Sequence, residues 1–169
     1  MTSRVALRAA AIVGAAAMAG VATAPVAQAD DWALNGRYLA TSNGDWAQIN
    51  EVYHDLPSVR STWTIAMTCT TYITCSGRVD SDEGWSADIV ITNSEYIVDV
   101  VRPNWEPCPD GTAIEGHQRF RFFPVAPSGF LQPGSRVFAG IDKTRGRSGG
   151  CGKNDTLQIE IPFRLEKLD

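Results

Sequence analysis

The feature that most constrains the fold is a strict alternation of apolar and polar residues, clearest near the C-terminal end of the chain. Apolar side chains occupy every second position there, at Leu157, Ile159, Ile161, Phe163 and Leu165. Successive side chains of a β-strand point to opposite faces, so this pattern is typical of a strand with one buried and one wet face. Strands of this kind build antiparallel sheets. We therefore predict an all-β protein.

The same alternation recurs along the chain and predicts about eight strands. Their expected ranges are 37–42, 59–69, 75–80, 86–92, 95–102, 117–124, 136–142 and 156–166. Segments rich in Gly, Pro, Asn and Asp separate them and are typical of turns. We expect a single antiparallel β-barrel or β-sandwich, because both architectures satisfy the pattern.

Three local patterns add detail to this prediction. Asn43-Gly44 is a two-residue hairpin signal between two apolar segments. Apolar residues share a helical face over 47–53, which predicts one short helix. Pro162 lies within the last predicted strand, and proline cannot donate to a ladder of hydrogen bonds, so we expect a sheet edge or a bulge there.

Residues 1–29 have the pattern of a secretory signal peptide. Arg4 and Arg8 precede an uncharged, alanine-rich segment over 9–24, and Ala27-Gln28-Ala29 is typical of a cleavage site. We expect cleavage between Ala29 and Asp30, and a secreted or otherwise extracytoplasmic protein without a membrane span in its mature form.

The remaining part of the chain, 30–169, has the length of a single domain. The whole sequence has 15 basic and 19 acidic residues, and loss of Arg4 and Arg8 with the signal peptide leaves a net charge of −6. Nucleic-acid binding draws much of its affinity from neutralised phosphates, so an acidic chain argues against it. The acidic net charge also argues against binding to anionic membrane surfaces.

All four cysteines, Cys69, Cys75, Cys108 and Cys151, follow the predicted cleavage site. An even number of cysteines in an oxidising compartment predicts disulfides, and four of them allow three connectivities. We favour Cys69–Cys75 with Cys108–Cys151, because the first pair flanks a short turn-like segment. The alternative is a zinc site, against which the wide spacing of the first pair argues.

Two patterns resemble those of serine hydrolases. Ser148 lies in Gly146-Arg147-Ser148-Gly149-Gly150, which fits G-x-S-x-G, and His54 precedes it in the chain. A nucleophile elbow needs a buried strand before the serine and a helix after it, whereas here a charged turn precedes and a strand follows. We therefore predict no catalytic residue and no enzyme activity, with a hydrolase using Ser148 or His54 as the alternative.

Two charged segments are candidate ion sites. The segment 80–84 begins like a calcium loop, but Gly84, Trp85 and Ile91 occupy the positions where such a loop needs a ligand, a glycine and a glutamate. The basic residues between 136 and 153 are typical of a solvated hairpin loop. We predict no metal site and no cofactor.

Three tryptophans, Trp46, Trp85 and Trp105, lie at the edges of predicted turns, each close to an acidic residue or an asparagine. Exposed indole rings in such places can stack on a sugar or an apolar ligand. The alternative is that they close the ends of the barrel or sandwich. We interpret them as the candidate ligand-binding residues of a non-enzymatic module that takes an apolar or glycan ligand, or a protein partner, at the cell envelope. A structural or host-interaction protein without a small ligand is the further alternative.

Short motifs over most of the chain after the signal peptide carry a family resemblance. They are 35–38, 41–47, 59–64, Gly84-Trp85, 104–111, Cys151-Gly152 and 162–165. With these motifs the chain resembles a family of uncharacterised secreted proteins from mycobacteria and related actinobacteria. The resemblance implies export and a shared cysteine framework, and it carries over no activity and no catalytic residue.

Overall fold

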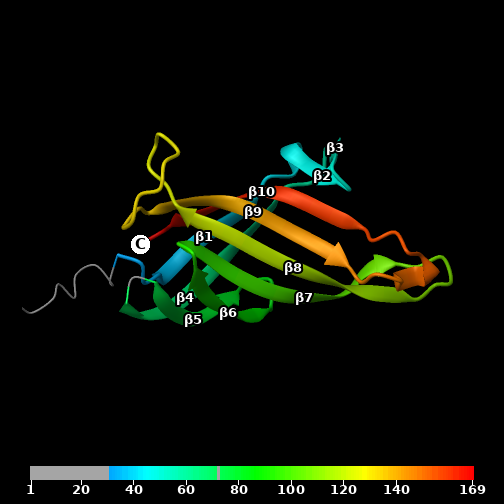
Figure 1. Cartoon of the computed structure of the whole chain (residues 1–169), viewed down its shortest axis with the longest axis horizontal. Helices are drawn as coiled ribbons and strands as arrows, with labels where there is room; N and C mark the ends of the chain where they lie inside the picture. Colours follow the sequence, from blue (N-terminus) through cyan, green and yellow to red (C-terminus); the bar gives the residue numbers. More distant parts are fainter. Residues whose placement is uncertain (1–30, 72) are drawn as a thin grey trace, which may run out of the picture.

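The protein is a closed, eight-stranded antiparallel β-barrel in the residues that the computed structural model describes, 31–71 and 73–169. The predicted signal peptide and its cleavage site at Ala29 and Asp30 lie outside the described residues. The barrel strands are β1 (Asn35–Ser42), β4 (Val59–Thr71), β5 (Thr74–Ser81), β6 (Ser86–Thr92), β7 (Glu95–Pro107), β8 (Ala113–Pro124), β9 (Val137–Gly146) and β10 (Gln158–Lys167). Each pairs with the next, and β1 pairs with β10 to close the barrel (Figure 1). Of the two predicted architectures, the barrel is therefore correct.

All eight predicted strands are present, and the main difference is that three of them are longer than predicted by at least three residues. β7 continues to Pro107, β8 begins at Ala113 and β9 continues to Gly146. Figure 1 shows these strands and β10 extending beyond the shorter strands β5 and β6 toward one end of the molecule. The extension forms one wall of the site described below.

The predicted helix over 47–53 and the predicted hairpin at Asn43-Gly44 are both wrong. Residues 47–54 form the short strands β2 (Ala47–Ile49) and β3 (Val52–His54), and β2 pairs with β10. The hairpin turn lies at Asn50 and Glu51, whose φ angles of 47° and 69° are those of a type I′ turn.

Asn43 and Gly44 have a different role from the predicted hairpin turn. Asn43 caps a single 3₁₀ turn, η1 (Gly44–Trp46), by accepting a hydrogen bond from the backbone of Asp45. A Cβ at Gly44 would lie 2.0 Å from the carbonyl oxygen of Leu56, so this close approach requires glycine.

Pro162 is neither at an edge nor at a bulge, because β10 has neighbours on both sides. Its position coincides instead with a break in the pairing, between Phe163, which pairs with β1, and Glu160, which pairs with β2. The carbonyl oxygen of Pro162 accepts a hydrogen bond from the backbone of Asn43 at this break. The missing N–H of proline therefore interrupts no ladder.

The core fills one part of the barrel with interlocking aromatic rings. Trp63 is 1% exposed, and its ring lies 4.9 Å from that of Phe120 and 5.3 Å from those of Phe163 and Trp85, measured between centroids. Aromatic pairs at such separations are favourable beyond the area that they bury. Trp63 is thus the centre of the core.

Both disulfides have the predicted connectivity. Cys69 is bonded to Cys75, and Cys108 to Cys151. The zinc alternative is therefore wrong, since all four sulfur atoms are bonded in pairs. The second bridge ties the end of β7 to the 3₁₀ turn η2 (Gly150–Gly152), which follows β9.

Within 31–71 and 73–169, no helix combines the length and apolar character that crossing a membrane requires.

Candidate functional site

One end of the barrel interior is polar and encloses a cavity of about 300 Å³. The inward positions of the strands carry apolar residues in the middle of the barrel and change to polar ones toward this end. The inward polar residues that line the cavity are all buried: Ser42, Ser61, Gln118, Asp142 and Thr144. The exposed residues Val59 and Pro103 also line the cavity, so it reaches the surface.

The carboxylate of Asp142 lies at the centre of this polar end. One of its oxygens accepts a hydrogen bond of 2.7 Å from the hydroxyl of Ser42, and the other accepts one of 2.6 Å from the amide nitrogen of Gln118. The three residues come from β9, β1 and β8, so closure of the barrel brings them together. Asp142 is 5% exposed and is the one buried residue with an acidic side chain in the described chain.

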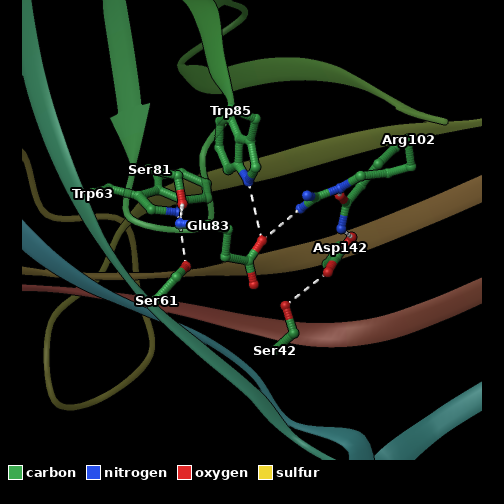
Figure 2. Close-up of polar contacts among 9 residues, drawn as sticks. Ser42, Ser61, Trp63, Ser81, Glu83, Trp85, Arg102 and Asp142 are labelled. Atoms are coloured by element: carbon green, nitrogen blue, oxygen red, sulfur yellow. Dashed lines mark hydrogen bonds and ion pairs between the residues drawn. The ribbon is translucent and has the colours of Figure 1, made fainter.

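A second carboxylate, that of Glu83, lies closer to the surface and is paired with an arginine. Arg102 from β7 donates to Glu83 at 2.9 Å, and its Nε donates at 2.5 Å to the amide oxygen of Gln118. Glu83 also accepts a hydrogen bond of 3.1 Å from the indole of Trp85. Figure 2 shows the side chains of Glu83, Arg102 and Asp142 pointing toward one another from three separate segments.

Trp105 is part of the cavity wall formed by the extension of β7, and it lies in a space that a glycine leaves open. A bulge between Arg102 and Glu106 interrupts the pairing of β7 with β8, and Asn104 within it has a φ of 52°. A Cβ on Gly116, on the facing strand, would lie 2.6 Å from the indole ring. The bulge and Gly116 together allow the ring to lie across the end of β8.

Burial raises the pKa of the Asp142 carboxyl above its ordinary value, because the charged form loses hydration. The hydrogen bonds from Ser42 and Gln118 and the positive charge of Arg102 lower this pKa in part. The hydrogen bonds and the nearby positive charge therefore make up for only part of the hydration that the ionised carboxylate loses on burial.

This shift predicts a pH-dependent stability difference between the protein and its Asp142→Asn variant. A carboxyl whose pKa is higher in the folded than in the unfolded chain contributes most stability below the unfolded value, and loses that contribution as pH rises through the folded value. From about pH 4 to about pH 7, the wild type should therefore lose stability relative to the variant. Urea unfolding across this range measures the difference. A difference in the free energy of unfolding that stays constant would contradict a raised pKa for Asp142. So would a wild type that gains stability relative to Asp142→Asn as pH rises.

Of the three tryptophans predicted to bind ligand, two line the cavity. Trp85 and Trp105 are part of its wall, whereas Trp46 lies on η1, does not line the cavity and is 68% exposed. Trp85 also packs against the core, stacked on Phe120 with 6.1 Å between the ring centroids, so this ring contributes to the core as well as to the cavity wall.

The structure does not bring the candidate catalytic residues together. Ser148 lies exposed in the turn after β9, and His54 lies exposed in β3. The other histidine of the chain, His117, is on the outer face of β8 and pairs with Glu115 at 3.3 Å. In the part of the chain that the structure describes, no hydrogen bond links Ser148 to either histidine.

The acidic segment over 80–84 spans the end of β5 and the turn that leads to β6, and it positions Glu83 against Arg102. The described residues contain no group of three His, Cys, Asp or Glu side chains arranged to hold a metal ion. The basic residues between 136 and 153 do not act as one unit, since Lys143 on β9 pairs with Glu160 while Arg147 lies in the following turn.

The sequence reasoning missed Ser42, Arg102, Gln118 and Asp142 as site residues. A signal for Asp142 was present, because it has the same parity in its strand as the apolar Phe138 and so belongs to the inward face. A charged residue on an inward face is uncommon and marks a candidate site.

Comparisons with known proteins find a protein of similar fold but assign the chain to no family. No family model matches the chain, and no curated protein matches it. Among solved structures, the chain is similar to the monomer form of the M. tuberculosis PknI sensor domain, with a TM-score of 0.57 and 14% sequence identity. The match covers 86% of this chain and 90% of that domain. At this identity the likeness shows the fold, a β-domain of the kind found in that sensor, and the resemblance to a secreted actinobacterial family stays a prediction.

Proposed function

We propose that the protein is an exported, non-enzymatic β-barrel that binds a small molecule in the polar end of its interior. The observation that carries this proposal is the cavity of about 300 Å³, whose wall combines aromatic rings with buried polar side chains. Ligand sites are typically concave, largely apolar and fitted with a few oriented polar groups. A barrel serving only as a scaffold gains nothing from burying a carboxylate, which costs stability.

Two further observations support the proposal. Disulfides persist in oxidising compartments, which agrees with a protein that acts outside the cytoplasm. A solved structure to which the fold is similar is a sensor domain, and sensing through ligand binding is compatible with the cavity. The exposed and separate positions of Ser148 and His54 favour binding over hydrolysis.

The proposal predicts that Trp105→Ala weakens the binding of small probes. The probes are two matched sets, one of glucosamine, glucose and glucuronate and one of benzylamine, benzyl alcohol and benzoate, followed by calorimetric titration. Molecules of this size reach roughly millimolar affinity, and loss of one stacking wall should weaken the best of them about fivefold to tenfold.

Gly116→Ala is a second variant for the same test, since it keeps the indole but displaces it from its place. Val101→Ala is the matched control, because Val101 lies on the exposed side of β7, the strand that carries Trp105. This change should leave binding unchanged. If none of the six probes binds the wild type, or if neither Trp105→Ala nor Gly116→Ala weakens binding, the cavity is not the ligand site.

Binding of a protein partner is a second candidate function, favoured by exposed apolar side chains beside the last strand of the sheet. Val52 and Tyr53 on β3 are 61% and 60% exposed, and Trp46 lies on the neighbouring turn η1. An apolar strand at a sheet edge is suited to pairing with another chain. Trp46→Ala separates the two functions, because it should leave probe binding in the cavity unchanged.

A further inference from the structure

We propose that the ligand carries a cationic amino group next to an apolar face, and that Asp142 is the residue that selects it. This inference rests on the proposed function, since it concerns the chemistry of the same cavity. It narrows the ligand from small polar molecules in general to amines.

The balance of charges in the cavity wall favours a cationic ligand. Three charged side chains line it, Glu83, Arg102 and Asp142. Arg102 and Glu83 neutralise each other through their contact at 2.9 Å. The amide of Gln118 separates the guanidinium of Arg102 from Asp142, and no ion pair of the described residues includes Asp142. When Asp142 is ionised, the cavity wall therefore carries one net negative charge.

The carboxylate of Asp142 also has unused acceptor capacity. An ionised carboxylate has about four lone-pair positions, and two donors, Ser42 and Gln118, occupy one position on each oxygen. A protonated amine brings three donors and a positive charge, so it can use the remaining positions and offset the cost of the buried charge. An anionic ligand would add a second negative charge to the same cavity.

The aromatic wall provides the second half of the recognition. Trp63, Trp85, Trp105 and Phe120 all line the cavity, and aromatic faces attract cations through their negative ring surface. The guanidinium of Arg102 already lies 5.3 Å from the centre of the Trp85 ring, which shows that a cation is accommodated there. A buried carboxylate beside several aromatic rings is a suitable environment for an ammonium group.

The two matched sets of probes test this inference directly, since the members of each set differ mainly in charge. At neutral pH, we expect glucosamine to bind about tenfold more tightly than glucose, and benzylamine about tenfold more tightly than benzyl alcohol. Glucuronate and benzoate should bind most weakly. The ranking is obtained with the wild-type protein alone, so it does not depend on whether a variant folds.

Asp142→Asn should abolish most of the preference, bringing each amine to within about threefold of its neutral analogue. Asp99→Asn is the matched control, because it makes the same change of charge on the outer face, where Asp99 pairs with Arg119. It should leave the ranking unchanged.

The outcomes separate this inference from the proposed function. Binding in which the neutral or anionic probe is equal to or better than the amine would overturn the amine assignment and leave the cavity as a ligand site. A preference for amines that persists in Asp142→Asn would overturn the role of Asp142. Absence of binding by all six probes would overturn the proposed function itself.

Discussion

Replacing Trp63 with alanine is expected to lower the free energy of unfolding by about 3 to 5 kcal/mol, the usual range for truncation of a fully buried tryptophan. Trp63 is 1% exposed and contacts four other aromatic rings, which are those of Trp85, Phe120, Phe122 and Phe163. Its removal would leave a void among rings that come from several strands and cannot easily close it. The cost should therefore lie toward the upper part of the range.

Urea unfolding followed by circular dichroism measures this effect, because the far-ultraviolet signal comes mainly from the backbone and is retained when the indole is removed. Trp46→Ala is the control, since this ring is 68% exposed, and its change should stay within about 0.5 kcal/mol. A cost near 1 kcal/mol for Trp63→Ala would contradict the position of this ring at the centre of the core.

The second large effect concerns the long disulfide. Replacing Cys108 and Cys151 together by serine should lower the free energy of unfolding by about 4 kcal/mol, on the loop-entropy relation for a separation of 43 residues. The same double replacement of Cys69 and Cys75, which are six residues apart, should cost about 2 kcal/mol. The difference arises because a longer closed loop restricts the unfolded chain more strongly.

Both double variants leave no unpaired thiol from the broken bridge, so they can be compared under the same conditions by urea unfolding. The long bridge also ties the end of β7 to the turn after β9, near the wall that carries Trp105. A larger cost for the Cys69–Cys75 pair would show that native packing around Cys75, and not chain entropy, determines what each bridge contributes.

Local alternation predicted the strands well because the side-chain period of two is imposed by the strand itself. It could not decide between barrel and sandwich, since closure depends on pairing between Tyr38 and Lys167 at opposite ends of the chain. The two short strands over 47–54 were missed for a related reason, since β2 pairs with β10, which lies more than a hundred residues later in the chain, and β3 pairs with β2.

The site was less predictable than the fold. Trp85 and Trp105 could be identified because aromatic residues at turn edges are visible in a sequence. Asp142 is the last residue of a predicted strand, where a charged residue is typical of the turn that follows, although its parity with Phe138 marks it as inward-facing. Its partners Ser42 and Gln118 come from other strands, so only the closed barrel shows that the three side chains meet.

The most direct test of the central claim, that a small molecule enters the polar end of the barrel, uses the indole N–H signals of the five tryptophans in a nuclear magnetic resonance titration. On addition of benzylamine, the signals of Trp63, Trp85 and Trp105 should shift together, because all three line the cavity. The signals of Trp32, buried against Tyr96, and of the exposed Trp46 should stay in place. A shift confined to Trp46, or unchanged signals from the three cavity tryptophans while benzylamine binds, would contradict the claim.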